Sequence, residues 1–448
     1  IDDFCFIFEN LMLGGGVGFS IRKEDVHELP RIKEGVSVTH RKKNDADFIV
    51  PDSREGWVKL LKKVLKAYFY TGRSFNYSTI LVRSAGDIIK GFGGKASGPG
   101  ILIEGIDNIC NVIKEREGKK LRSIDVLDIC NIIGSVVVAG NVRRSAEIAV
   151  GDPDDYLYLR AKRWDLGNIP NWRAMSNNTI YADSYDHISD VVWKGYDGSG
   201  EPYGFFNLPL AQKVGRLGER RKDRCEIINP CAEILLESYE CCNLSEIYLN
   251  NIESKSELKE CAKLLYKTQK AICALPFIHK KTEEIVHNNM RIGIGITGVC
   301  QSLDKIGWLD ECYQYLHEFD EKWSAREGYP PSIRLTTIKP SGCASVDCTV
   351  RTTSGIKSFA EIAYENGITS EMFVEGSWHK PKTEILVYDE NNDEQKITNI
   401  FINGISEVYE IEDEDGMKYK FTPEHKLKTL NGWKRVDELE EGDKIVSF

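Results

Sequence analysis

A cysteine and a carboxylate lie two residues apart in the stretch 229–233 (NPCAE), directly after an apolar pair. Because proline restricts its own backbone, such a turn can hold the side chains of Cys231 and Glu233 toward one substrate. The thiol can supply a nucleophile or a radical, and the carboxylate can move a proton. Cys242 follows further along and can exchange reducing equivalents by disulfide chemistry. The competing interpretation is that Cys231 is a small buried hydrophobic residue.

A second cysteine, Cys343, opens a different pattern, and a Thr-x-x-His pair, Thr422 and His425, follows it along the chain. A cysteine thiol can attack the carbonyl of the preceding residue and turn an amide into a thioester. A histidine can protonate the leaving amide nitrogen, and a threonine hydroxyl can polarise the peptide bond. Gly342 leaves the attacked carbonyl sterically open. These residue types therefore fit chemistry on the backbone of the protein itself.

The first pattern resembles the asparagine-cysteine-glutamate loop of ribonucleotide reductases. Further stretches are similar to the monomeric, adenosylcobalamin-dependent reductases, and they occur in the family's order. They are GGGVGFS at 14–20, PDSREGW at 51–57, GFGGKASGP at 91–99, DICNIIGSVVVAGNVRRSAE at 128–147, SNN at 176–178, RIGIGITG at 291–298 and TTIKPSG at 336–342. One glycine-rich stretch carries little weight, but the ordered series across residues 5–342 is specific.

The resemblance implies an α/β fold, a partial ten-stranded barrel with Cys231 on a central loop. Adenosylcobalamin would generate a thiyl radical on Cys231, and this radical would take the 3′-hydrogen of a ribonucleotide, with a leaning toward triphosphates. Glu233 would serve as acid and base at the 3′-hydroxyl, while Asn229 would hydrogen-bond the ribose. Cys242 matches one member of the reducing cysteine pair, which a thioredoxin-type reductant would restore. Its neighbour Cys241 leaves open which of the two thiols reacts.

Pro340, Ser341 and Gly342 look like the start of the family's substrate phosphate loop, where successive backbone N–H groups form an anion nest. An ordinary β-turn is the competing interpretation. The sequence then departs from the family, because Cys343 follows and the second half of the barrel and its tail cysteines are missing. Cys5 lies too close to the glycine run to be the other reducing cysteine, so we expect it in the core. We expect this chain alone to be an incomplete reductase.

The second pattern resembles the first two sequence blocks of inteins. Residues 343–355 (CASVDCTVRTTSG) are similar to the opening block, and residues 421–425 (FTPEH) with 433–443 (WKRVDELEEGD) to the second. The resemblance implies a mostly-β Hint domain in which Cys343 is the nucleophile, His425 the proton donor and Thr422 the polarising hydroxyl. Cys348 is a weaker candidate for the first residue, because it lies too close to the strand that follows. The predicted division is a reductase fragment at 1–342 and an intein segment at 343–448.

Three interpretations follow. The chain is a split precursor that is joined in trans to a C-terminal intein and extein polypeptide, or it is part of a contiguous intein-containing reductase. Alternatively it is a non-catalytic module whose cysteines bind metal, although the adjacent pair 241–242 lacks Cys-x-x-Cys spacing. An acidic run at 437–443 fits either a solvated face or a docking surface for a basic partner half.

Helical and strand patterns alternate up to about residue 340, which predicts an α/β architecture. The pattern at 123–139 predicts a helix with Ser123 at its N-cap, and 291–299 predicts a buried strand. Short strand-like runs follow at 384–388, 396–402, 408–412 and 418–421. Turn signals lie at 391–393, 413–416 and 431–432, so we expect an all-β domain of hairpins with its boundary in 340–345.

The bulk composition narrows the function classes. With 448 residues the chain should form two or three domains, and 41% hydrophobic with 29% charged residues indicates a globular protein. No apolar run reaches the roughly 20 residues of a membrane span, and a net charge of −10 argues against nucleic-acid binding. Thirteen cysteines without a signal peptide indicate reduced thiols and a cytoplasmic location. The start Ile-Asp-Asp-Phe resembles the interior of a longer protein.

Overall fold

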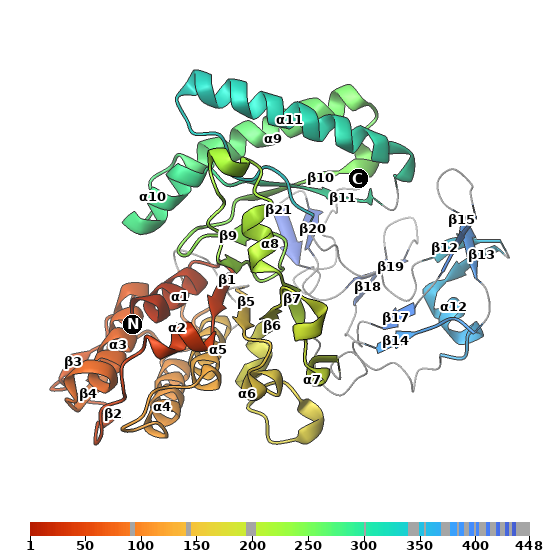
Figure 1. Ribbon diagram of the computed structural model, residues 1–448. Helices are drawn as coiled ribbons and strands as arrows, with labels where there is room; N and C mark the ends of the chain where they lie inside the picture. The colour runs from red at the N-terminus through yellow and green to blue at the C-terminus, as the bar shows by residue number, and fades with distance from the viewer. Residues whose placement is uncertain are drawn as a thin grey trace. The chain divides into compact units, whose positions relative to one another are not determined.

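The computed structural model describes residues 1–89, 95–139, 145–193, 203–299, 302–338, 349–353 and 355–368, with shorter stretches beyond. The shorter stretches are 377–382, 385–388, 394–397, 400–402, 409–412, 418–421, 426–429 and 432–435. Figure 1 labels the helices and strands along the chain, which divides into two compact units. The larger unit consists of residues 1–248, 252–296 and 310–340, and the smaller of 249–251, 297–309 and 341–448.

Four parallel strands form the main sheet of the larger unit, in the order β1-β5-β6-β7. Their bounds are β1 Val17–Ser20, β5 Glu147–Gly151, β6 Ser176–Tyr181 and β7 Gly204–Phe206. Side chains alternate between the two faces of the sheet. Ile148 packs on one face against Phe206 and Ile228, whereas Ala149 and Ile180 belong to the larger core on the other. Strand β5 is buried along its whole length, as expected for a sheet that is covered on both faces.

Four helices build the larger core with this sheet. They are α1 Asp2–Met12, α3 Arg54–Lys66, α4 Gly100–Lys114 and α5 Ser123–Val138. Helices α1 and α5 contact strands of the sheet, and α3 and α4 pack on these two helices. Helix α5 contacts α1, α4 and β5 and is buried on nearly every side, which explains why its sequence is apolar all round.

The predicted helix at 123–139 is confirmed, but its predicted cap is wrong. Arg122 is the N-cap residue, and its backbone N–H donates to the Asp125 carboxylate at 2.7 Å in a capping box. Ser123 is the first helical residue, and its hydroxyl donates to Asp155 instead. Because the Asp125 carboxylate accepts the backbone N–H of the N-cap residue Arg122, the helix begins without a serine cap.

The remaining elements of the larger unit include a second parallel sheet, β2-β4-β3. Their bounds are α2 Lys23–His27, β2 Val38–His40, β3 Phe48–Ile49, β4 Phe75–Ser78, α6 Tyr156–Leu159, α7 Asp190–Trp193, α8 Leu208–Lys213, β8 Ile227–Ile228, β9 Leu235–Leu236, β10 Leu244–Tyr248, α9 Lys255–Cys273, α10 Lys280–Asn289, β11 Gly293–Thr297 and α11 Ile306–Glu327. Strand β11 confirms the predicted strand at 291–299 with shorter bounds. It pairs with β10, and its Ile294 forms a parallel bridge with Thr336. The predicted α/β class is confirmed, and in the described part the strands form separate ladders.

From residue 349 onward, the described residues of the smaller unit form antiparallel strands and one short helix. The four-stranded sheet has the order β13-β12-β15-β16, and three two-stranded ladders pair β14 with β17, β18 with β19 and β20 with β21. Their bounds are β12 Thr349–Thr352, β13 Gly355–Ser358, α12 Phe359–Glu365, β14 Ser377–His379, β15 Leu386–Tyr388, β16 Glu394–Lys396, β17 Ile400–Ile402, β18 Tyr409–Glu412, β19 Lys418–Phe421, β20 Lys426–Thr429 and β21 Gly432–Arg435.

The predicted turns at 391–393, 413–416 and 431–432 lie, apart from Gly432, outside the described residues, but the strands on either side of each one pair antiparallel, as the predicted hairpins require. The expectation of an all-β segment is wrong at α12. Ser358 and Glu361 form a capping box that starts this helix, a local signal that the strand-like texture hid.

No helix in the described stretches of either unit is both long and apolar enough to cross a membrane.

Candidate active site

The stretch that carries Cys231 is the turn of the β8–β9 hairpin, and we call residues 229–234 the finger loop. Asn229, only 5% exposed, closes this turn. Its backbone N–H donates to the Ile234 carbonyl at 3.2 Å, and its Oδ1 accepts from the Ile234 N–H at 3.1 Å. Ala232 takes a left-handed φ of 61°, which is uncommon without glycine and places Cys231 at the tip. Because the amide oxygen of Asn229 serves the turn, a substrate contact would fall to its amide nitrogen.

Two glycines of the GGGVGFS stretch let the hairpin lie directly against β1. A Cβ atom on Gly18 would lie 2.0 Å from the Ile228 carbonyl oxygen. A Cβ atom on Gly16 would lie 2.7 Å from Cγ of Pro230. Neither position tolerates a side chain without moving the hairpin, so these glycines set how deeply the finger loop lies over the sheet.

Cys231 is exposed and Glu233 is half-buried, so the loop presents both side chains at its tip. Within the described part of the chain, Oε2 of Glu233 is buried and has no hydrogen-bond partner. A buried oxygen without a donor costs about 1–3 kcal/mol, and such groups in native proteins often mark function. Beside the thiol, the loop therefore offers an acceptor for an incoming hydroxyl group.

The two adjacent cysteines have different surroundings in the structure. Cys242 is accessible but has protein on most sides, and this desolvation, followed by the charges of Cys241, Glu233 and Cys231, raises its pKa from 9.0 to about 11. Burial also raises the pKa of Cys241 to about 11, but the charges it senses are those of Glu240 and Cys273. Cys242 is thus the thiol within electrostatic range of Cys231 and Glu233, and it stays protonated at neutral pH.

Cys5 lies in the core, where burial raises its pKa to about 11, and the prediction of a core residue is confirmed. Among the residues that the structure describes, no three His, Cys, Asp or Glu side chains gather to hold a metal ion.

Two residues that the sequence did not single out hold the finger loop. Asn177 on β6 donates from Nδ2 to the Pro230 carbonyl at 2.8 Å. The Thr337 hydroxyl donates to the Glu233 carbonyl. Both residues lie in stretches that resemble the reductase family, SNN and TTIKPSG, and this resemblance is the signal by which the sequence could have identified them. The sequence of these stretches does not show which side chain faces the finger loop.

The other predicted site residues lie outside the described residues. They are Pro340, Ser341 and Gly342 of the phosphate-loop stretch and Cys343, Thr422 and His425 of the second pattern. Their roles stay predictions.

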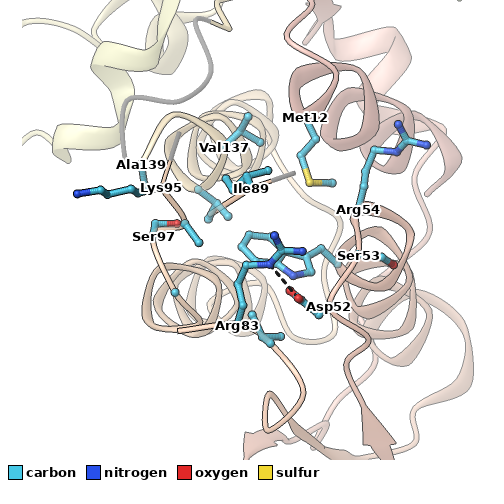
Figure 2. Close-up of a pocket in the computed structure, with 15 residues that line it drawn as sticks. Met12, Asp52, Ser53, Arg54, Arg83, Ile89, Lys95, Ser97, Val137 and Ala139 are labelled. Carbon is cyan, nitrogen blue, oxygen red and sulfur yellow. Dashed lines mark hydrogen bonds and ion pairs between the residues drawn. The ribbon is translucent and has the colours of Figure 1, made fainter. Parts of the chain in front are cut away.

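A separate pocket joins two of the quoted stretches, PDSREGW and GFGGKASGP (Figure 2). Arg83 points across it to Asp52, with Nε 2.8 Å from Oδ2. Ser53 caps α3 at the pocket wall by accepting the Gly56 N–H at 3.0 Å. The finger loop contributes no residue to its lining, so the described stretches serve at least two different places in the larger unit. The lining residues are Met12, Asp52, Ser53, Arg54, Trp57, Val82, Arg83, Ile89, Lys95, Ala96, Ser97, Gly98, Val136, Val137 and Ala139.

Comparison with protein families identifies two regions. Residues 30–113 match the family described as the insertion domain of B12-dependent ribonucleotide reductase. Residues 190–309, which include the finger loop and Cys242, match the barrel domain of ribonucleotide reductase.

Individual relatives agree with these matches. The adenosylcobalamin-dependent ribonucleoside-triphosphate reductase of Lactobacillus helveticus is 32% identical, over 76% of this chain and 55% of the relative. That of Euglena gracilis is 34% identical, over 77% of this chain and 48% of the relative. A crystal structure of a B12-dependent, class II ribonucleotide reductase has a TM-score of 0.65 and 28% identity, over 76% of this chain and 56% of that chain. The chain spans about half the length of these relatives. Over the part that these matches cover, the chain is therefore similar in sequence and fold to B12-dependent, class II ribonucleotide reductases.

Proposed function

We propose that the larger unit is the part of a ribonucleoside-triphosphate reductase that carries the radical cysteine. The observation that supports this most is that the finger loop presents a thiol and a carboxylate close together in the sequence. An exposed thiol, Cys231, lies two residues from Glu233, whose buried Oε2 has no hydrogen-bond partner in the described part of the chain. A ribose 3′-hydroxyl would supply the missing donor and bring the 3′-hydrogen to the thiol.

The cofactor of this reaction is adenosylcobalamin, on which the relatives depend by name. The site fits such a group at the thiol, because Cys231 is exposed at a loop tip. The residues that hold the corrin ring are not assigned. When bound, the cofactor supplies a radical that oxidises the thiol by removing its hydrogen atom.

The residues of this chain perform the remaining steps. Cys231 takes the 3′-hydrogen of the nucleotide, Glu233 accepts the 3′-hydroxyl proton at Oε2, and the amide nitrogen of Asn229 holds the ribose. Removal of the 2′-hydroxyl consumes two electrons, which a pair of thiols provides as it becomes a disulfide. Cys242 is one of that pair, protonated at neutral pH because its pKa is about 11. A thioredoxin-type reductant restores the dithiol.

Residues 340–342 supply the substrate phosphate loop in this proposal. In the sequence they come shortly after Thr336, which bridges β11, and they lie outside the described residues. Backbone N–H groups of such a turn bind phosphate oxygens.

The test of the reductase proposal uses the chain joined to a polypeptide that supplies the remaining reductase sequence. With adenosylcobalamin and a ribonucleoside triphosphate tritiated at C3′, we expect Cys231→Ser and Glu233→Gln each to lower turnover by at least about 100-fold. Cys261→Ser, a half-buried position on α9, serves as the matched control and should leave turnover within about twofold. Full turnover by Cys231→Ser would refute the proposal. Ribonucleotide reduction by this chain alone, without the joined polypeptide, would refute the prediction that the chain is an incomplete reductase.

For residues 343–448 we propose the N-terminal part of an intein, which starts protein splicing at Cys343. The sequence blocks support this, together with the antiparallel ladders β18–β19 and β20–β21 that flank the Thr-x-x-His pair. Cys343 attacks the Gly342 carbonyl, His425 protonates the leaving nitrogen and Thr422 polarises the peptide. A C-terminal intein half on a second polypeptide is the partner, unless the reading frame continues as a contiguous intein.

Intact-mass analysis of the chain mixed with a matching C-terminal intein half tests the splicing proposal. We expect residues 1–342 to become joined to the partner's extein. Cys343→Ala should abolish this product, because alanine has no nucleophile, whereas Cys348→Ala should splice normally. Splicing by Cys343→Ala would assign the nucleophile elsewhere. If no product forms, the reading frame after Phe448 decides between a mismatched half and a contiguous intein.

A further inference from the structure

The finger loop is held before its tip by the main sheet. Asn177 on β6 donates from Nδ2 to the carbonyl of Pro230, the residue directly before Cys231, at 2.8 Å. The neighbouring Asn178 belongs to the opposite face of the strand, where it is 3% exposed and accepts from the Ser176 hydroxyl at 3.0 Å. Of these two asparagines, only Asn177 contacts the loop.

After its tip the loop is held by the other ladder. The Thr337 hydroxyl donates to the carbonyl of Glu233, two residues after Cys231. The backbone N–H of Thr337 donates to the Ile294 carbonyl on β11 at 3.1 Å, which fixes this threonine to the ladder. Thr336, the preceding residue, is exposed and has the opposite orientation.

The same ladder carries Cys242 at its edge. The carbonyl of Asn243, the next residue, accepts from the Gly293 N–H at 3.0 Å and from Nε2 of Gln269 at 2.7 Å. A Cβ atom on Gly293 would lie 3.1 Å from Cγ2 of Thr337, so this threonine also packs where Cys242 is anchored. The anchor of Cys242 and the Thr337 anchor of the finger loop therefore both lie on strand β11.

We propose that Asn177 and Thr337 are positioning residues that hold the finger loop from both sides and set the distance between the Cys231 and Cys242 thiols. Each bond ends on a backbone carbonyl next to the tip, so it constrains the loop without touching a reacting atom. Radical transfer and disulfide exchange both need sulfur atoms at fixed separations, and a small misplacement of a reacting group can be costly. We call these two hydrogen bonds the clamp. The importance of the thiol separation for catalysis rests on the proposed reductase function, whereas the existence of the clamp does not.

The test measures the separation of the thiols in the full chain, without cofactor or substrate. Bifunctional methanethiosulfonate reagents of graded spacer length are applied, and the Cys231–Cys242 cross-link is quantified by peptide mass mapping. The variants are Thr337→Val, which removes the hydroxyl donor, and Asn177→Ser, whose shorter side chain is expected not to reach the Pro230 carbonyl. Their matched controls, Asn178→Ser and Thr336→Val, are the neighbours on the opposite faces. Asn177→Asp, which keeps the side-chain volume but lacks the amide donor, is measured in parallel. If one variant does not fold, the other still tests the role of Asn177.

We expect the wild-type chain to form this cross-link over a narrow range of spacers. In Asn177→Ser, Asn177→Asp and Thr337→Val the range should widen, and the rate with the optimal spacer should fall about three- to tenfold, the size of one hydrogen bond. The controls should keep the wild-type profile. Cys110 and Cys312 are buried and must stay unreactive, which separates a clamp from general destabilisation.

An unchanged spacer profile and rate in the folded Asn177 and Thr337 variants would overturn the clamp. Because this readout needs no turnover, an inactive but correctly clamped protein would count against the reductase proposal alone.

Discussion

Replacing Arg291 by methionine should destabilise the larger unit by about 3–5 kcal/mol, the usual cost of breaking a buried ion pair from one side. Arg291 is 1% exposed. Its guanidinium binds Asp223 through two bonds of 2.7 and 3.1 Å and Glu240 through one of 2.9 Å. Methionine fills a similar volume but leaves both carboxylates buried with less compensating charge. Arg334, which binds Asp223 at 2.7 Å, and the nearby Arg221 are further cations of this cluster.

The pKa of Asp223 shows what the arginine contributes. Burial alone would raise this pKa, but the hydrogen bonds and charges of Arg291 and Arg334 hold it below its ordinary value of 3.8. A carboxyl group with a lowered folded-state pKa stabilises the fold above that ordinary value, and the stabilisation is lost as the pH falls through the folded-state pKa. The effect of Arg291→Met should therefore be large at pH 7 and smaller in acid.

Urea unfolding of the full chain at pH 7, followed by tryptophan fluorescence, measures this difference. Lys322→Met is the matched control, because Lys322 forms only an exposed pair with Glu318 at 3.5 Å. That variant should stay within about 1 kcal/mol of wild type. Adding Asp223→Asn and Glu240→Gln to Arg291→Met should recover part of the loss, since the buried charges are then removed. An unchanged urea midpoint in Arg291→Met would show that this cluster does not stabilise the fold.

Replacing Glu147 by glutamine should stabilise the chain at neutral pH by on the order of 1–3 kcal/mol and have little effect near pH 4. Glu147 begins β5 and is 1% exposed. Within the described residues neither carboxyl oxygen has a hydrogen-bond partner. The carboxyl group lies against α5, where a Cβ atom on Gly134 would come within 2.9 Å of it. Burial raises the pKa of Glu147 well above its ordinary value of 4.5.

The direction of the effect follows from proton linkage. Above pH 4.5 the unfolded chain releases the proton of Glu147 while the folded chain retains it, so rising pH favours unfolding until the folded-state pKa is reached. Glutamine has no proton to lose and avoids this penalty.

Urea midpoints of wild type and Glu147→Gln at pH 4.5, 6.0 and 7.5 therefore should diverge as the pH rises. Glu219→Gln, at a side chain that is 90% exposed, should track wild type at every pH. If Glu147→Gln instead loses stability at pH 7.5, the carboxylate is ionised and paired in the folded protein.

The sequence by itself determined those features of this protein that are encoded within a few residues. The apolar run of α5 predicts a buried helix, and the asparagine and glycine turns predict the hairpins of the smaller unit. The two-residue spacing of Cys231 and Glu233 predicts that one tight loop presents both side chains. Local backbone preferences and side-chain periodicity act over three or four positions, so these features can be read without a tertiary structure.

The tertiary structure decided what joins distant segments. Asn177 and Pro230 are 53 positions apart, and Thr337 and Glu233 are 104 apart. The sequence resemblance pointed to Cys242 but left open which of Cys241 and Cys242 reacts, and the packing around them brings Cys242 within range of the charges of Cys231 and Glu233. Such contacts depend on sheet register, because a shift of one residue turns every side chain to the other face of a strand. Asn177 and Asn178 carry the same side chain, and their place on opposite faces of β6 gives only Asn177 a contact with the loop.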